Sequence, residues 1–232
     1  DINKINFNAN FDIVFFLGEY SRVEQSFDDI DTVFAFNFGP AYEVLKFCRS
    51  NGSKLIYAGS STKFGDDGGN AYASPYAWTK KVNTELVQVY SNWFGVNYAI
   101  TYFYNVYGQG EISNGKYSTL IAKFANLVRE GEEVLPVVSP GTQVRNFTHV
   151  DDIVEGLILV AERGQGDGYG IGADESFSIL EVAEMFGKSV QMLPERPGNR
   201  LAAQLNTQQT KNLGWRPVNN LRDYIQAQLA AK

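Results

Sequence analysis

Three short apolar segments, separated by amphipathic segments, constrain the fold of this chain most strongly. The apolar segments are DIVFFLG (12–18), SKLIYAGSS (53–61) and VNYAITYFY (96–104). Each is short enough for a strand and apolar on both of its faces. Continuous apolar strands that alternate with helices are typical of a parallel sheet covered on both sides. We therefore predict an α/β fold built on a parallel sheet.

Two amphipathic helices are expected between these strands. The first, 36–52, ends at Gly52, and the second, 74–94, is stopped by Gly95, because glycine commonly terminates helices. The predicted apolar positions of the first helix are Tyr42, Val44, Leu45 and Phe47. Those of the second are Val82, Leu86, Val89, Tyr90 and Trp93, which share one stripe.

The second half of the chain mixes helical and extended patterns. Segments 117–131 and 177–187 are amphipathic, and LRDYIQAQLAA closes the chain as a helix. We place a domain boundary after residue 106, with a smaller α+β lobe at 107–232. About residues 143–173 are expected to be partly woven back into the sheet.

Charge and composition exclude several classes of partner. With 20 basic and 26 acidic residues among 232, the net charge is −6, which disfavours nucleic acid and anionic membranes as partners. The single cysteine, Cys48, excludes an internal disulfide framework and favours a cytoplasmic protein. Its apolar helical surroundings favour packing over reactivity. No signal peptide and no apolar run of about 18 residues is found, and no metal site is predicted.

One glycine-rich segment invites a dinucleotide-binding interpretation. GYGIGA (168–173) matches G-x-G-x-x-A, but that fingerprint requires a preceding strand and an acidic residue about 20 positions later. A helix and a loop precede it here, and Met192 occupies the later position. We favour a loop that leads into a strand.

The segment SPYAWTK (74–80) carries the most specific chemistry. Ser74 is suited to cap a helix and Pro75 to its first turn, so Tyr76 and Lys80 stand one turn apart on one face. An ammonium near a phenol favours the phenolate, which can take a proton from a sugar hydroxyl. Tyr-x-x-x-Lys also arises by chance, but Ser60 at the preceding strand end can complete a hydrogen-bonded relay.

These segments, in this order, give the chain a family resemblance over nearly its whole length. The chain resembles the extended short-chain dehydrogenase/reductase family, in its nucleotide-sugar epimerase/dehydratase branch. The matching stretches are DIVFFLGEYSRV, FNFG with Asn37, YAGSSTKFGD, SPYAWTK, YFYNVYGQG, GTQVRNFTHVDDIVEG, ERPGNR and NLGWRP. The resemblance implies a Rossmann-like NAD-binding domain at 1–106 that lacks its first strands and glycine-rich turn. It also implies a substrate-binding lobe at 107–232.

The resemblance assigns catalytic and cofactor roles by position. Tyr76 would be the base, and Lys80 would assist it and hold the nicotinamide ribose of NAD. Asp1 and Ile2 resemble the strand end near the cofactor adenine, and Leu17 with Gly18 would line the cofactor through backbone groups. An acidic residue that separates NAD from NADP would lie before Asp1.

Further positions would contact the substrate. Ser60 matches the hydroxyl residue that hydrogen-bonds the sugar 4-hydroxyl, and Thr62 either assists or caps a turn. Asn105, Arg145 and Arg196 would bind the nucleotide diphosphate, although a turn asparagine and surface arginines are the simpler interpretations.

Other polar residues match structural positions of the family. Asn37 occupies a helix asparagine position near the lysine. His149, the only histidine, precedes a helix and is interpreted as structural rather than as a base. Asp151 and Asp152 are expected to cap that helix, where the helix dipole favours negative charge.

The chain departs from the family pattern at several positions. The dehydratases carry an Asp-Glu pair after the catalytic hydroxyl residue, where this chain has Ser61 and Thr62. Elimination of water needs an acid and a base, which two hydroxyls do not supply. Tyr102 and Asn146 also replace an arginine and an aspartate, which leaves the identity of the sugar open.

The sequence therefore predicts an NAD-dependent nucleotide-sugar epimerase that acts at C4 through a transient 4-keto sugar. The implied enzyme would be a homodimer that serves carbohydrate biosynthesis. Two alternatives remain open: a keto-sugar-nucleotide reductase or dehydrogenase of the same family, and a catalytically silent protein that binds nucleotide sugars.

Overall fold

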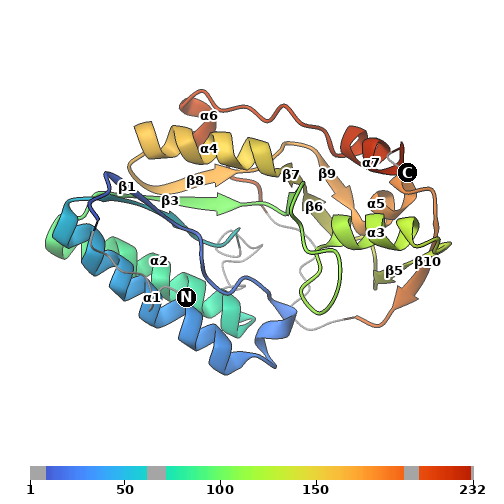
Figure 1. Ribbon diagram of the computed structural model, residues 1–232, viewed down its shortest axis with the longest axis horizontal. Coiled ribbons are helices and arrows are strands. Elements are labelled where there is room, and N and C mark those ends of the chain that lie inside the picture. The colour runs from blue at the N-terminus through green and yellow to red at the C-terminus, as the bar shows by residue number, and fades with distance from the viewer. Residues whose placement is uncertain (1–8, 62–71, 196–203, 231–232) are drawn as a thin grey trace.

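A parallel sheet of four strands forms the centre of the fold. The computed structural model describes residues 9–61, 72–195 and 204–230. The strand order is β1-β2-β3-β8, and every neighbouring pair is parallel (Figure 1). The strands are β1 (Ile13–Phe16), β2 (Lys54–Ala58), β3 (Tyr98–Phe103) and β8 (Gly166–Ile171). This architecture confirms the predicted α/β fold with a parallel sheet.

Helices cover both faces of this sheet. Helices α1 (Ile30–Asn51) and α2 (Pro75–Phe94) pack on each other below the sheet in Figure 1, and α4 (Val150–Arg163) lies on the opposite face. Consecutive residues of β2 therefore enter different cores: Leu55 packs toward α1 and α2, and Ile56 packs toward α4. Full burial of such a side chain contributes about 1.5–3 kcal/mol, which explains why β2 is apolar on both faces.

Both predicted helix ends are confirmed, but the first helix starts early. Gly52 and Gly95 adopt left-handed conformations, with φ of 68° and 72°, at the ends of α1 and α2. Helix α1 begins at Ile30 rather than at residue 36. The apolar pattern did not reveal the extra turns, because the apolar residues Phe34 and Phe36 are exposed there instead of lying on the buried face.

The predicted apolar stripe of α2 is wrong in part. Val89 and Trp93 are 38% and 67% exposed, and the buried face is largely polar. That face comprises Ala77, Thr79, Lys80, Asn83, Thr84, Val87, Tyr90 and Ser91. Helix α2 thus presents polar groups toward the sheet edge, where side chains of the loop after β1 meet them.

The remaining elements surround a second, separate core. The helices are α3 (Leu120–Arg129), α5 (Ile179–Met185), α6 (Gln208–Asn212) and α7 (Leu221–Ala230). The strands are β4 (Val106–Tyr107), β5 (Val134–Val138), β6 (Val144–Asn146), β7 (Thr148–His149), β9 (Ser176–Ser178) and β10 (Ser189–Leu193). Phe124, Leu135 and Ile225 belong to this core, and β5 pairs with β10 in parallel.

The segment 168–173 lies mostly in β8 and pairs with β3, so the predicted strand is confirmed. The loop that was expected to lead into it ends earlier, because β8 already begins at Gly166. The Cβ of any other residue at Gly170 would lie 1.8 Å from the Asn206 carbonyl oxygen. Close packing therefore accounts for a glycine in this segment.

The start of α4 differs from the prediction. His149 is its N-cap residue, and its Nδ1 accepts a hydrogen bond of 3.2 Å from the Asp151 N–H. Asp152 is 2% exposed and accepts hydrogen bonds from Val218 and Asn219 instead. Asp152 thus holds the segment before α7 by hydrogen bonds rather than capping its own helix.

None of the helices in the described ranges has the length and apolar composition needed to span a bilayer.

Candidate active site

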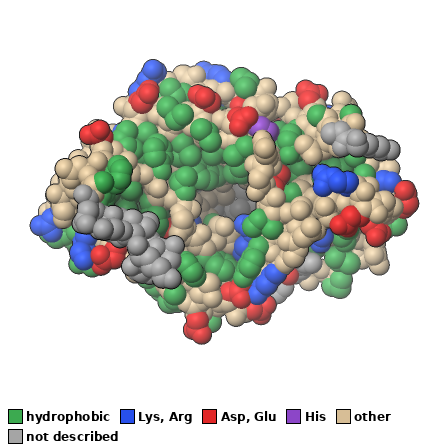
Figure 2. All heavy atoms as spheres, viewed as in Figure 1, with side chains coloured by type: hydrophobic (Ala, Val, Ile, Leu, Met, Phe, Trp, Pro, Cys, Tyr) green, Lys and Arg blue, Asp and Glu red, His purple; other side chains and the backbone are tan. Residues whose placement is uncertain are grey.

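The carboxyl ends of β1, β2 and β3 converge on a cleft of about 680 Å³. Leu17, Ser60, Tyr76, Lys80 and Asn105 all line it. Gly18 immediately follows Leu17 at the end of β1. Figure 2 shows a hollow near the centre of the molecule, in the region where these strands end in Figure 1. The structure therefore brings together residues from positions 17 to 105 at the sheet edge that parallel α/β folds use for ligands.

Two hydroxyl side chains meet in this cleft. The Tyr76 hydroxyl donates to the Ser60 Oγ at 3.2 Å. Ser74 is the N-cap of α2, and its Oγ accepts from the Ala77 N–H at 3.1 Å, which fixes the first turn that carries Tyr76. Tyr76 is half-buried, so its ring is held while its hydroxyl stays at the cleft.

Lys80 is buried one turn further along α2. Its Nζ donates to the Ala58 carbonyl oxygen at 2.5 Å and to the Glu19 carboxylate. The two charged side chains are only 6% and 1% exposed, respectively. Glu19 follows Gly18 directly, and sequence reasoning missed it. The signal was present, because a carboxylate at the end of an apolar strand lies where ligand-binding residues are expected.

Both carboxylate oxygens of Glu19 accept hydrogen bonds. It accepts hydrogen bonds from the Tyr57 hydroxyl at 2.9 Å and from the Asn83 side-chain amide at 2.6 Å. Burial, with the nearby Glu19 carboxylate, raises the pKa of Tyr57 well above its usual value. Tyr57 is therefore a neutral donor to Glu19 at any physiological pH.

Asn37 connects α1 to the same region. Its side-chain amide donates to Thr79 Oγ1 at 2.8 Å and accepts from the Tyr20 N–H at 2.8 Å. Its backbone carbonyl accepts from Asn83 at 2.7 Å. Asn37 thus joins α1, α2 and the loop after β1, which agrees with the structural role that was expected.

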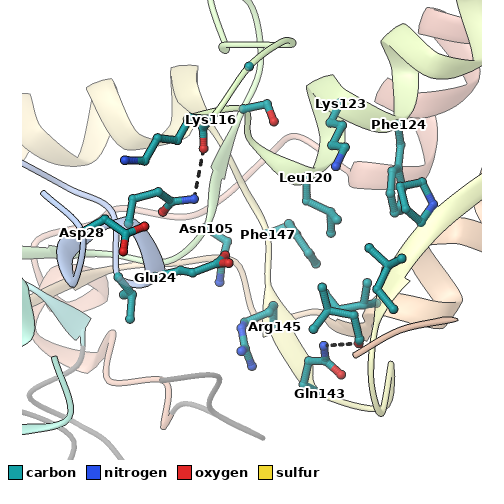
Figure 3. A pocket seen from close by; sticks show the side chains of 18 residues that line it. Glu24, Asp28, Asn105, Lys116, Leu120, Lys123, Phe124, Gln143, Arg145 and Phe147 are labelled. Atoms are coloured by element: carbon teal, nitrogen blue, oxygen red, sulfur yellow. Dashed lines mark hydrogen bonds between the residues drawn. The ribbon is translucent and has the colours of Figure 1, made fainter. Parts of the chain in front are cut away.

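A second cavity, of about 670 Å³, lies beside the cleft (Figure 3). Asn105 lines both spaces and donates to the Asn146 carbonyl oxygen at 3.1 Å. Arg145 lines the second cavity but not the cleft, and its Nη1 donates to the Val144 carbonyl oxygen at 2.8 Å. Figure 3 shows Arg145, Asn105 and Phe147 between an acidic side at Glu24 and Asp28 and the Lys123 side.

A cluster of four side chains ties the loop before α1 to the loop before α3 beside this cavity. Asp29 accepts from Lys116 Nζ at 2.7 Å, from the Tyr117 hydroxyl at 2.8 Å and from the Tyr20 hydroxyl at 2.9 Å. The Lys116 hydrogen bond, followed by those of the two tyrosines, lowers the pKa of Asp29. We call these residues the Asp29 cluster.

The positions that depart from the family pattern are accommodated by local bonds. The Tyr102 hydroxyl donates to Asp167 at 2.6 Å, and burial, with that hydrogen bond, raises the pKa of Tyr102. The Asn146 amide donates to the carbonyl oxygens of Ala173 and Glu175 at 3.0 and 3.2 Å. Both residues therefore serve the framework behind the cavities.

Four predicted site residues, Asp1, Ile2, Thr62 and Arg196, lie outside the described residues. Within the described residues, no group of three or more His, Cys, Asp and Glu side chains is arranged to hold a metal ion.

Comparison with known families decides the wider assignment. Residues 2–172 match the model of the NAD dependent epimerase/dehydratase family. The chain belongs to this family. The match includes the Ser60–Tyr76 pair, Lys80, Asn105 and Arg145.

The chain is similar to several proteins within and beyond the matched region. It is 26% identical over 244 residues to the trifunctional UDP-glucose 4,6-dehydratase/UDP-4-keto-6-deoxy-D-glucose 3,5-epimerase/UDP-4-keto-L-rhamnose-reductase of Arabidopsis thaliana, covering 96% of this chain and 36% of that protein. The chain thus spans about a third of the length of that curated relative.

Solved structures show the same fold. The UDP-glucose 4-epimerase of Thermus thermophilus, solved with NAD, has a TM-score of 0.83 at 25% identity, covering 94% of this chain and 76% of that one. The UDP-N-acetylglucosamine 4-epimerase of Methanobrevibacter ruminantium has a TM-score of 0.87 at 22% identity, covering 100% of this chain and 82% of that one.

The residues at the cleft fit the cofactor of an NAD-dependent family. Backbone groups follow the β1 and β2 ends at Leu17 and Ser60, and the cleft between them is large enough for a nucleoside portion. The Tyr76 hydroxyl and Lys80 ammonium line the same space and supply the hydrogen-bonding groups that a ribose needs.

Proposed function

We propose that this protein is a nucleotide-sugar epimerase that inverts C4 of its sugar through a transient 4-keto sugar, with NAD as cofactor. The observation that carries the proposal is the Ser60–Tyr76 hydrogen bond of 3.2 Å in a cleft beside the cavity that Arg145 lines. A hydroxyl pair suits proton transfer from an alcohol, and an arginine suits a diphosphate.

In this proposal, Tyr76 removes the proton of the sugar 4-hydroxyl while Ser60 hydrogen-bonds the same oxygen. Bound NAD would supply the hydride acceptor and, after the sugar turns over, the hydride donor. Ser60 and Tyr76 then return the proton to the 4-oxygen, so the cofactor ends in its starting state. Lys80 holds the ribose and assists Tyr76.

The substrate would extend from the cleft into the second cavity. Asn105 lines both spaces, which supports a diphosphate that crosses at this residue. Arg145 would neutralise its charge, and Arg196, outside the described residues, would add to it. Phe147 and Leu120 line the same cavity and offer an apolar surface to a base.

Ser61 supports epimerisation over dehydration. It lines the cleft directly after Ser60, where elimination of water would need a carboxyl group. A serine hydroxyl at this position leaves the oxidation and re-reduction of C4 as the chemistry that the cleft residues can serve.

The test is incubation of the full protein with UDP-, dTDP- and GDP-sugars, with C4 configuration read by NMR. Appearance of the C4 epimer without net change in NADH absorbance supports the proposal. Stoichiometric oxidation or reduction of cofactor would replace it with the reductase or dehydrogenase alternative. Binding of a nucleotide sugar without turnover would indicate the silent alternative.

We also propose a cytoplasmic homodimer formed through α1 and α2. Phe34, Phe38 and Trp78 form one aromatic cluster on these helices, with ring centroids 5.1–5.8 Å apart. Phe34 and Trp78 remain 38% and 37% exposed, and Trp93 is 67% exposed. Such an apolar surface on two packed helices supports an interface with a second copy. Light scattering should give twice the chain mass, and a monomer at micromolar concentration would exclude this interface.

A further inference from the structure

The Lys80 ammonium, which the proposed mechanism uses, is already paired with a carboxylate. Lys80 has three N–H groups, and the Ala58 carbonyl oxygen and the Glu19 carboxylate accept two of them. Both charges are almost completely buried. A positive charge compensated at contact distance exerts a much weaker potential on a third group than an isolated one.

In the part of the chain that the structure describes, the groups around Lys80 come from three elements. The loop after β1 provides Glu19, β2 provides Tyr57 and the Ala58 carbonyl, and α2 provides Tyr76 and Asn83. Lys80 Nζ also lies 5.0 Å from the centre of the Tyr57 ring. Among these groups Glu19 is the only carboxylate. Its two other bonds, to Tyr57 and Asn83, hold it in place.

We propose that Glu19 is a positioning residue that holds the Lys80 ammonium and weakens the positive potential that Lys80 exerts at the Tyr76 hydroxyl. This inference rests on the proposed function in one respect, namely that Tyr76 is the base. Glu19 thereby sets how readily Tyr76 reacts as a phenolate. A bound cofactor ribose would also have to share the Lys80 ammonium with the Glu19 carboxylate.

Nitration by tetranitromethane, which attacks phenolates, tests this without substrate or cofactor. Trypsin releases Phe64–Lys80, a peptide that contains both Tyr72 and Tyr76. Tyr72 is 66% exposed and serves as the internal reference. The measured quantity is the nitration rate of Tyr76 relative to Tyr72, read by mass spectrometry.

In Glu19→Gln, this ratio should rise about tenfold, because the Lys80 charge is no longer compensated. Glu43→Gln, which removes an exposed carboxylate that pairs with Lys46 on α1, should leave it unchanged. The double variant Glu19→Gln/Lys80→Met carries neither charge and should return the ratio to the wild-type value. A ratio that stays high in the double variant would mean that a loosened loop, rather than charge, exposes Tyr76, and would overturn the inference.

The double variant also decides the question if Glu19→Gln does not fold. Equal ratios in the wild type and the double variant support compensation, whereas a much higher ratio in the wild type contradicts it. Thermal unfolding adds a second readout. Lys80→Met alone leaves the buried Glu19 carboxylate without its cation, so its melting temperature should lie about 6–12 °C below that of the wild type. Adding Glu19→Gln should restore most of this difference.

The two proposals fail in different ways. If no nucleotide sugar is turned over but the nitration ratios behave as described, the proposed function fails and the role of Glu19 stands. If turnover depends on Tyr76 but the ratio is the same in the wild type and Glu19→Gln, only the role of Glu19 is wrong.

Discussion

The Tyr76 hydroxyl donates a hydrogen bond to the Ser60 hydroxyl across 16 positions of sequence. Ser60 follows β2 and Tyr76 stands in the first turn of α2, so the bond joins the sheet to the helix at the cleft. The Ser74 cap and Pro75 fix that first turn. The geometry of this pair therefore depends on how α2 is placed against the sheet.

Removing the Ser60 hydroxyl should slow catalysis more than it weakens binding. In Ser60→Ala, we expect kcat to fall about 10–100-fold with little change in nucleotide-sugar affinity, because one partner in proton transfer is lost. Ser61→Ala is the matched control, since Ser61 lines the same cleft but is not a partner in the Tyr76 bond. Steady-state kinetics with equal kcat values for the two variants would argue against a relay through Ser60.

Arg145 should contribute to binding rather than to chemistry. In Arg145→Met, the Kd for a nucleoside diphosphate should rise about tenfold or more, because a charged hydrogen bond contributes about 1.5–3 kcal/mol. Isothermal titration with UDP, dTDP and GDP measures this. Arg129→Met, at the end of α3 and outside the Arg145 cavity, should leave Kd unchanged. Equal affinities in both variants would remove Arg145 from the diphosphate site.

Asp152 should be important for stability although its neighbour is not. Asp152→Ala leaves the backbone N–H groups of Val218 and Asn219 without their acceptor, at a cost of about 2–4 kcal/mol in the free energy of unfolding. Asp151→Ala, whose side chain is 77% exposed, should cost less than about 1 kcal/mol. Urea denaturation compares the two, and similar losses would show that the Asp152 bonds contribute little.

The Asp29 cluster should weaken in acid. Its hydrogen bonds lower the pKa of Asp29 in the folded protein, so their contribution is complete above the ordinary aspartate value of about 3.9 and is lost as pH falls through the lower folded value. The difference in melting temperature between wild type and Asp29→Asn should therefore be largest above about pH 5 and shrink toward pH 2. A difference that is constant across this range would contradict the role of the carboxylate charge.

Sequence patterns predicted the parallel sheet well because its central strands, β2 and β3, are buried on both faces. Leu55 and Ile56 point into different cores, so β2 is apolar from Leu55 to Ala58. Glycines in left-handed conformations likewise made the ends of α1 and α2 visible. The polar buried face of α2 was not predicted, because its partners lie far away in sequence: Glu19 after β1, Asn37 on α1 and the Ala58 carbonyl of β2.

The same reason explains what was missed at the site. Tyr76, Lys80 and Ser60 lie in recognisable local motifs. The only sequence signal for Glu19 is its place at the end of an apolar strand, and its pairing with Lys80, 61 positions away, is visible only in the folded chain. At the start of α4, Asp151 and Asp152 were expected to cap the helix, with His149 just before it. In the structure the His149 imidazole is the cap. This role depends on the local backbone geometry, which the sequence does not show.

The most direct measurement is turnover by Tyr76→Phe, which removes one oxygen and keeps the ring. We predict a loss of C4 epimerisation of about 100-fold or more, with nucleotide-sugar affinity and melting temperature close to those of the wild type. Turnover at the wild-type rate in this variant would contradict the assignment of Tyr76 as the base.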